Sequence, residues 1–168
     1  TLWGAAGNDS LDGGDGDDLV QQEINTDQVL VDTLLTGDGQ DTLVSIEAAD
    51  LAGGASDNTL DAIGFTNGPV TLSGLAGDDT LVGSVGDDSL EGGDGTDLIQ
   101  QTADADQVLT DTQVTGVGTD ALLAVEEAVL TGGVSSNTLD ATDFTVGQVT
   151  LLALDGNDTL IGSAGSDS

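Results

Sequence analysis

The feature that most constrains this chain is a run of three nine-residue repeats between residues 74 and 100. They read GLAGDDTLV (74–82), GSVGDDSLE (83–91) and GGDGTDLIQ (92–100), with glycine at positions one and four, aspartate at six and an aliphatic residue at eight. Glycine permits the positive φ angles of a tight turn and leaves backbone carbonyls uncovered. The aliphatic residue has to be buried in a very short strand. The cycle therefore predicts tight turns and short strands in alternation.

The chain also repeats on a longer scale. Residues 1–79 align without a gap with residues 80–158, and residues 159–168 begin a third copy. We therefore expect one continuous repeat domain over residues 1–168. Solenoids need capping segments for solubility, and neither end of the sequence contains one. We expect a piece of a longer array, or one building block of an end-to-end assembly.

Large aliphatic residues recur in each unit, mostly at every ninth position, and are expected to face inward. Two steps of the first unit are longer, from Val29 to Leu43 and from Leu60 to Leu72. Short strands between glycine-rich turns are typical of a parallel solenoid rather than of helices. The steps predict eight strands per unit, which form four coils of about 20 residues. The inward-facing residues are Leu2, Leu11, Val20, Val29, Leu43, Leu51, Leu60, Leu72, Leu81, Leu90, Ile99, Val108, Leu122, Leu130, Leu139, Leu151 and Leu160.

Because eight is even, each turn is expected to keep its side of the solenoid from one unit to the next. One side then carries a nearly continuous series of glycine-bearing turns, while the other side is mixed. The series comprises residues 13–18, 36–41, 53–58, 74–79, 92–97, 115–120, 132–137 and 153–158. On the other side only residues 4–9, 83–88 and 162–167 fit the pattern.

Two further groups of apolar residues are notable. Phe65 and Phe144 occupy the second longer step of each unit, where a wider turn should fold the ring over the core; a ligand pocket is the alternative. A second group is expected to project outward from one face. Isolated exposed apolar residues are normal, but a row of them could form a lateral contact stripe. This group comprises Trp3, Val44, Val82, Leu123 and Ile161.

Charge limits what the turns can bind. The chain has 32 acidic residues and no lysine, arginine, histidine or cysteine, so its formal net charge is −32. A compact chain with this charge repels itself and needs an external cation. Oxygen atoms are the only ligands on offer, which favours Ca²⁺ over Zn²⁺ or Cu²⁺. The lack of cationic side chains argues against binding nucleic acid or an anionic membrane, and no apolar run is long enough for membrane insertion.

The missing residue types also argue against catalysis. Histidine, cysteine, lysine, arginine and tyrosine are absent, which removes most general bases and nucleophiles. Carboxylate pairs of the kind used by glycosidases are present, but they fall in the repeat register, where metal binding accounts for them. We therefore expect no enzymatic activity.

The nonapeptides resemble the calcium-binding repeats-in-toxin (RTX) family, whose consensus is GGxGxDxUx. The resemblance implies an all-β fold, a right-handed parallel β-roll or β-solenoid with about 18–20 residues and two short strands per coil. It also implies that Ca²⁺ ions lie between stacked turns. Each ion would be held by the sixth-position side chains of both turns and by backbone carbonyls.

Carried over by position, the resemblance implies a set of metal ligands. The main carboxylates are Asp18, Asp41, Asp79, Asp97, Asp120 and Asp158, and Asn58 and Asn137 replace the carboxylate in weaker or vacant sites. On the mixed side Asp9 would pair with Asp27 and Asp88 with Asp106, and Asp167 belongs to the third copy. The carbonyl ligands would be those of Gly13, Asp15, Asp17, Gly74, Ala76, Asp78, Gly92, Asp94 and Thr96.

These features suggest a chain that folds when it binds Ca²⁺. Our first interpretation is a structural repeat of a secreted or cell-surface bacterial protein, such as a surface layer, filament or adhesin stalk, that contacts copies of itself. The family resemblance implies export by a type I route, for which an unfolded cytosolic chain is useful. The alternative is a calcium-folded carrier module of a toxin, protease, lipase or polysaccharide epimerase. Ice binding ranks below both, because the outward neighbours are not rows of threonine and asparagine.

Overall fold

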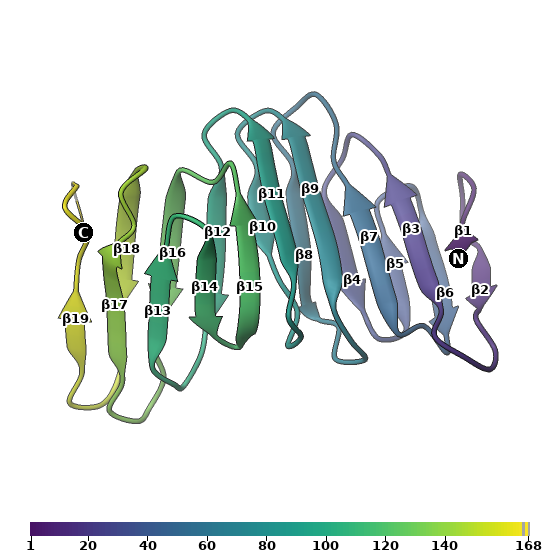
Figure 1. The fold of residues 1–168 in the computed structure, drawn as a ribbon. Helices are drawn as coiled ribbons and strands as arrows, with labels where there is room; N and C mark the ends of the chain where they lie inside the picture. Colours follow the sequence, from purple (N-terminus) through teal and green to yellow (C-terminus); the bar gives the residue numbers. More distant parts are fainter. Residues whose placement is uncertain (166, 168) are drawn as a thin grey trace.

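The computed structural model describes residues 1–165 and 167, which form strands and turns in two sheets that face each other (Figure 1). Sheet A contains, in order, β1 (Leu2–Trp3), β3 (Leu19–Glu23), β7 (Ala48–Ala52), β9 (Val70–Ala76), β11 (Ser89–Asp94), β15 (Gly118–Leu123), β14 (Gln113–Gly116), β13 (Gln107–Thr110), β17 (Thr138–Asp143) and β19 (Thr159–Ile161). Sheet B contains, from the same end, β2 (Ser10–Asp12), β6 (Gln40–Val44), β5 (Leu34–Thr36), β4 (Gln28–Val31), β8 (Thr59–Gly64), β10 (Thr80–Val82), β12 (Leu98–Thr102), β16 (Glu127–Thr131) and β18 (Gln148–Leu152). Among the described residues there is no helix long and apolar enough to cross a membrane.

Most of the chain winds back and forth between the sheets, so that each strand pairs in parallel with strands one coil away. Leu81 in β10 pairs with Leu60 in β8, one coil earlier, and with Ile99 in β12, one coil later. Each such coil contributes one strand to each sheet. This confirms the predicted all-β parallel roll.

Two three-stranded meanders, each made of consecutive hairpins, interrupt the winding, and the sequence analysis did not predict them. In the first unit β4, β5 and β6 form an antiparallel meander within sheet B, and in the second unit β13, β14 and β15 do so within sheet A. Because the first meander adds residues to its coil, strands that pair in parallel with it are farther apart in sequence. Leu11 in β2, for example, pairs with Leu43 in β6. The expected count of eight strands per unit is wrong, because the long step from Val29 to Leu43 holds an additional strand, β5.

Local sequence explains the first meander. Asp32 and Thr33 form the short connection between β4 and β5, and residues 37–39 connect β5 to β6. Gly37 and Gly39 have φ angles of 142° and 139°, which favour glycine. A Cβ at Gly39 would overlap the carbonyl oxygen of Gly7, so the hairpin packs directly on the neighbouring backbone.

The meanders change how the units are related. Three consecutive strands remain in one sheet, so each unit crosses between the sheets an odd number of times. Equivalent strands of successive units therefore lie in opposite sheets: β1 is in sheet A, and its counterpart β10 is in sheet B. The expectation that each turn keeps its side is wrong for this reason.

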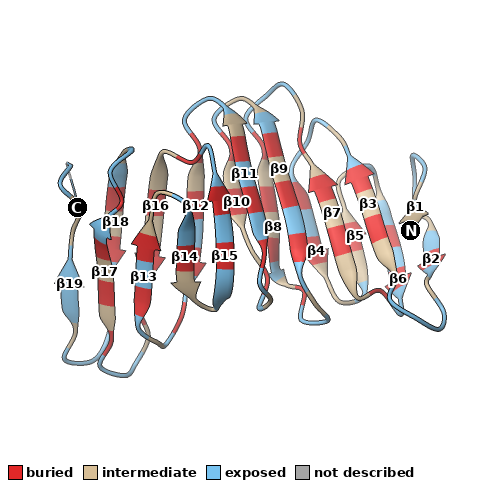
Figure 2. Cartoon of the chain, viewed as in Figure 1, coloured by how far each residue is buried: buried red, intermediate tan, exposed pale blue. Residues whose placement is uncertain are grey.

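The core lies between the sheets, where inward side chains form the buried bands of Figure 2. Most predicted inward residues are buried, but Val29 and Val108 are exposed, and Gln28 and Gln107 beside them are fully buried instead. Each glutamine amide donates to a backbone carbonyl of the next coil, Ala52 at 2.7 Å and Thr131 at 2.8 Å. These hydrogen bonds satisfy a buried polar side chain where the sequence pattern favours valine.

The ends of the predicted core rows are less covered. Leu2 is half-buried, and Leu160 is 45% exposed. Leu160 lies in β19 of sheet A, opposite the place where the described part of sheet B ends at β18.

The aromatic prediction is confirmed, and the outward stripe is not. Phe65 and Phe144 are fully buried at the wider turns. The five outward residues do not share a face, because Trp3, Leu123 and Ile161 lie in sheet A while Val44 and Val82 lie in sheet B. The switch of sheets between units divides them.

Candidate metal centre

The sixth-position side chains lie along two edges of the roll. We call edge 1 the edge where the chain passes from sheet A to sheet B, and edge 2 the edge where it returns. The eight glycine-bearing turns assigned to one side are divided between the two edges, because equivalent turns of successive units exchange edges. Edge 1 holds 36–41, 53–58, 74–79 and 92–97, and edge 2 holds 13–18, 115–120, 132–137 and 153–158.

A repeated hydrogen bond links sixth-position residues along each edge. The backbone N–H of Asp79 donates to Oδ1 of Asp97 at 2.8 Å, and the N–H of Asn58 donates to Oδ1 of Asp79 at 2.7 Å. One oxygen of each carboxylate is thus used to tie two coils together. The same bond joins Asp9 to Asp41, Asp88 to Asp120 and Asn137 to Asp158.

Within the described residues, the other carboxylate oxygen is both buried and without a partner at two positions. Oδ2 of Asp79 and Oδ2 of Asp97 are buried without a hydrogen-bond partner, and the two side chains are 1% and 0% exposed. An unpaired charged oxygen inside a protein is costly, and structures retain one only where something else compensates it. The chain contains no lysine, arginine or histidine to do so.

These oxygens point into spaces that only glycine leaves open. A Cβ at Gly74 would overlap Oδ2 of Asp79 and lie 2.6 Å from the carbonyl oxygen of Gly92 in the next coil. A carboxylate oxygen and a carbonyl oxygen therefore converge at the first position of the turn. No three carboxylates gather at one point within the described residues. A cation there would draw on carbonyls as well as carboxylates, a mixed oxygen set that suits Ca²⁺.

The nonapeptide turns that cross between the sheets fall into two classes, which differ at the second position. In what we call closed turns, the second-residue N–H donates to the sixth side chain of the same turn: Ala5 to Asp9, Gly54 to Asn58, Ser84 to Asp88 and Gly133 to Asn137, at 2.6–3.1 Å. In what we call open turns, the second residue has a positive φ, and this hydrogen bond is not made. The open turns are those of Gly14 (85°), Leu75 (78°), Gly93 (114°) and Leu154 (63°). The two unpartnered oxygens belong to open turns.

Burial affects the titration of several of these groups. It raises the pKa of Asp79, Asp88 and Asp97 above the ordinary value, and that of Asp120 to about 7. Loss of solvation is the largest cause in each case, and neighbouring carboxylates add to it. Without a bound cation these side chains resist ionisation.

Several predicted neighbours are wrong. Asp9 faces Asp41 rather than Asp27, and Asp88 faces Asp120 rather than Asp106. Asp27 and Asp106 are exposed, and each accepts an N–H from the next coil, that of Thr59 or Thr138. The hairpins cause the change, because they bring the turns at 36–41 and 115–120 beside the turns at 4–9 and 83–88.

Asp18 also has a neighbour other than the predicted Asp41. Its N–H donates to Oε2 of Glu47 at 3.0 Å, and the N–H of Asp97 likewise donates to Oε2 of Glu126 at 3.1 Å. The sequence analysis missed both glutamates, because their turns contain no glycine. The detectable signal is their spacing, since each glutamate follows the aspartate that it contacts at the same interval in both units.

The fifth-position side chains, also missed, form an outer series of coil-to-coil hydrogen bonds. Asp57 accepts the N–H of Asp78, and Asp78 accepts the N–H of Thr96, at 2.9 and 2.8 Å. Asp87 accepts the N–H of Thr119 at 2.8 Å. These exposed carboxylates hold adjacent turns in register and leave the sixth-position groups to face inward.

The contacts of the turns give the positions of only some of the predicted carbonyl ligands. The carbonyls of Gly74 and Gly92 face the glycine of the preceding turn, as a shared site requires. The carbonyl of Asp94 accepts the N–H of Gly77 at 2.9 Å. The remaining ligand assignments, Asp167 included, stay predictions.

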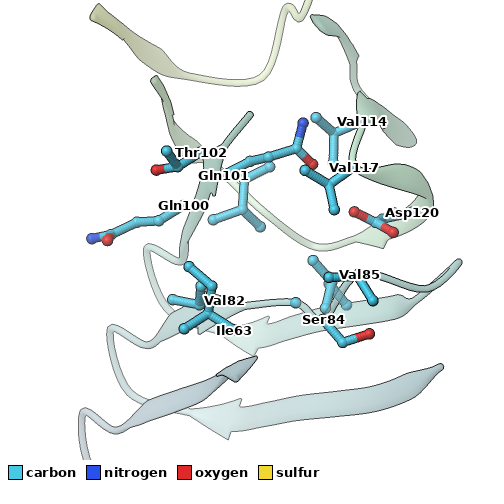
Figure 3. A pocket seen from close by; sticks show the side chains of 13 residues that line it. Ile63, Val82, Ser84, Val85, Gln100, Gln101, Thr102, Val114, Val117 and Asp120 are labelled. Atoms are coloured by element: carbon cyan, nitrogen blue, oxygen red, sulfur yellow. The ribbon is translucent and has the colours of Figure 1, made fainter. Parts of the chain in front are cut away.

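A cavity of about 140 Å³ lies beside the second hairpin (Figure 3). Ile63, Val82, Val114 and Val117 line it, and Asp120 lies at its side. Asp120 belongs to both the cavity and the edge 2 series, whose next carboxylate, Asp106, is held in a different coil. The second meander thus contributes both a part of the cavity wall and a sixth-position carboxylate.

Two comparisons with known proteins gave different results. No curated protein matches the chain at a significant level. A family model described as RTX calcium-binding nonapeptide repeat (4 copies) matches residues 1–20, 71–100 and 147–168. These segments contain all four open turns, and the hairpins lie outside them. These three segments of the chain therefore carry RTX calcium-binding nonapeptide repeats.

Proposed function

We propose that this calcium-binding repeat chain is a structural segment of a secreted or cell-surface protein, and that it becomes a stiff rod when it binds Ca²⁺. The observation that carries the proposal is the pair of buried, unpartnered oxygens on Asp79 and Asp97 in a chain with no cationic side chain. Such groups make the metal-free fold unfavourable and reserve a place for a divalent cation.

The residues of the open turns perform the binding. Oδ2 of Asp79 and the carbonyl of Gly92 present negative and partial negative charge to one point, while Oδ1 of Asp97 remains tied to the Asp79 N–H. A bound Ca²⁺ ion supplies two positive charges and joins adjacent coils. At tenfold saturation each site would stabilise the fold by about 1.4 kcal/mol. Several sites together are comparable with the stability of a small domain, so metal binding can decide whether the chain folds.

The proposed location follows from affinity. Extracellular calcium modules bind with dissociation constants of about 10⁻⁴–10⁻³ M, far above the free Ca²⁺ of a cytosol. The chain would remain expanded inside the cell and fold after export. Proteins with these repeats are typically secreted, which supports the same location. We propose no catalytic role, because the residue types that usually supply bases and nucleophiles are absent.

The rod-like character follows from continuous sheets. Both sheets run the length of the described chain without a break in strand pairing, and β1 and β19 lie at opposite ends of the stack (Figure 1). Each coil is fixed to the next by backbone pairing and by the edge hydrogen bonds. A repeated array of such units would resist bending because every coil shares its neighbours' hydrogen bonds.

The test is far-UV circular dichroism during Ca²⁺ titration of chelator-treated protein, with Mg²⁺ as the control cation. We expect a disordered spectrum in chelator and a cooperative gain of β-structure near millimolar Ca²⁺. Mg²⁺ should act weakly, because it demands a stricter octahedral geometry. A β-rich spectrum in chelator that Ca²⁺ does not change would contradict the proposed switch.

A further inference from the structure

The two glutamates that the nonapeptide pattern does not include occupy a distinctive place. Glu126 lies in a glycine-free turn directly beyond the open turn at 92–97, and Glu47 lies in the equivalent turn beyond 13–18. Because equivalent turns exchange edges, the first pair is on edge 1 and the second on edge 2. The hydrogen bond from the aspartate N–H to the glutamate thus occurs twice, in two separate settings.

The glycine-free turn copies the carbonyl geometry of a nonapeptide turn. A Cβ at Gly92 would overlap the carbonyl oxygen of Ala124 and lie 2.5 Å from Oδ2 of Asp97. In the ordinary pair of turns the corresponding carbonyl, opposite Gly74, is that of Gly92. Ala124 thus presents its carbonyl where a first-position glycine would, and Ser45 does the same opposite Gly13.

This carbonyl placement has a conformational cost. Ala124 and Ser45 have φ angles of 50° and 51°, a left-handed conformation that residues other than glycine seldom adopt. Neighbouring hydrogen bonds hold the turn in place, since the N–H of Glu126 donates to the carbonyl of Asp97 at 3.1 Å. Retained strain of this kind is typical of sites that position a ligand.

An oxygen without a partner points into the space between the two turns. Oδ2 of Asp97 is buried and accepts no hydrogen bond, and Asp97 is 0% exposed. Opposite it lies a second carboxylate, because Oε2 of Glu126 accepts the Asp97 N–H. The space is therefore bounded by two carboxylates and the Ala124 carbonyl, which are all hard oxygen ligands.

We propose that Glu126 and Glu47 each complete a calcium site with the preceding open turn, so that the cation series continues beyond the nonapeptide repeats. This inference rests on the proposed calcium-dependent fold, and it adds two sites that the nine-residue pattern does not supply. In each site a glutamate from a glycine-free turn replaces the sixth-position aspartate. The glutamate side chain is one methylene longer than that of aspartate, which compensates for a turn that has fewer residues.

The test counts bound ions by native mass spectrometry of the full chain in saturating Ca²⁺. We expect Glu47→Gln and Glu126→Gln each to bind one ion fewer than the wild type, and the double variant two fewer. Glutamine keeps an oxygen that can accept the Asp18 or Asp97 N–H, so a glutamate that only caps this N–H predicts no loss of ions. Glu23→Gln/Glu91→Gln is the matched control, because both residues are exposed and the charge change is the same.

Each outcome is decisive. A double variant that binds as many ions as the control would overturn the glutamate sites and leave calcium-dependent folding intact. A wild type that binds no ions would overturn both proposals. If the double variant loses β-structure in Ca²⁺, the two single variants give the count, because each leaves the opposite edge unchanged.

Discussion

Two neighbouring turns on edge 1 differ in whether the sixth side chain is satisfied within its own turn. The closed turn at 53–58 satisfies its sixth side chain internally, because Oδ1 of Asn58 accepts the Gly54 N–H at 2.9 Å. In the open turn at 74–79, Leu75 has a positive φ and the equivalent hydrogen bond to Asp79 is not made. Oδ2 of Asp79 is therefore left without a partner. The closed turn satisfies its sixth side chain without a metal, whereas the open turn leaves an oxygen that the proposed function assigns to a cation.

This difference suggests a division of labour along each edge. Under the proposed function, closed turns need no cation and act as spacers, while open turns respond to Ca²⁺. The backbone conformation at position two defines the class, and the side chain at position six sets the charge. Both can be changed separately by substitution, which allows the two contributions to be measured one at a time.

Removing the charge from the open turns should have the largest effect. We expect Asp79→Asn/Asp97→Asn to stabilise the metal-free fold by at least about 1 kcal/mol, because two buried anionic groups are removed. The same variant should lose about 1.4 kcal/mol of calcium-dependent stabilisation per site at tenfold saturation. Circular dichroism in chelator and in Ca²⁺ measures both changes.

The opposite signs are the essential point of this prediction. Asp38→Asn/Asp143→Asn is the matched control, since both residues are exposed and the charge change is equal. If the Asp79/Asp97 variant and this control respond alike, general charge repulsion accounts for the effect rather than the open turns.

Adding a charge to a closed turn should have a smaller effect. Asn58→Asp places a carboxylate beside Asp79, whose Oδ1 already accepts the Asn58 N–H. We expect the metal-free chain to lose about 1 kcal/mol and the Ca²⁺ midpoint to fall severalfold, because the step between these turns gains a second carboxylate. Gln100→Glu, at an exposed position, controls for charge. An unchanged midpoint would show that the class of the turn, not its charge, sets affinity.

The backbone at position two should contribute less. Leu75 has a φ of 78° and is 44% exposed, so glycine would relieve strain while little burial is lost. We expect Leu75→Gly to stabilise the calcium-loaded chain by about 0.5–1 kcal/mol in urea unfolding. Ala5→Gly, in a closed turn, should destabilise it by about 0.5 kcal/mol. The same sign for both substitutions would contradict the distinction between classes.

The smallest effect concerns carboxylates outside the edge series. The N–H and hydroxyl of Thr66 lower the pKa of Asp32, and Thr145 does the same for Asp111. A lowered pKa means that each contact stabilises the fold fully above about pH 4 and is lost as the pH falls through the folded-state value. Carboxyl ¹³C titration of the calcium-loaded chain should place both pKa values below 3.8. Thr66→Val should raise the pKa of Asp32 and leave that of Asp111 unchanged.

Much of the fold was predictable because each nonapeptide determines its own local structure. Glycine at positions one and four and the aliphatic residue at eight define a turn and a buried strand, and Leu81, Leu90 and Ile99 are buried as predicted. The sequence TGDGQD at 36–41 was misleading for the same reason. It has the composition of a nonapeptide turn, but its residues connect the antiparallel strands β5 and β6, and Gly39 packs on Gly7.

The metal series was predictable in kind rather than in connectivity. Asp79 and Asp97 are neighbours as expected, because no hairpin lies between them. Asp41 and Asp120 keep a sixth-position role, but their partners depend on where the hairpin places the chain, which no local spacing encodes. Glu47 could not be found from the nine-residue pattern, since its turn contains no glycine. Ser45, with a positive φ, presents its carbonyl opposite Gly13 instead.

The exchange of sheets between successive units gives a long array a property of parity. Each unit exchanges the sheets in which the equivalent strands of the next unit lie. Segments at the two ends of an array would therefore leave it on the same flank after an even number of units and on opposite flanks after an odd number. Adding or removing a single unit would therefore exchange the sheets that face each flank at the far end of such an array.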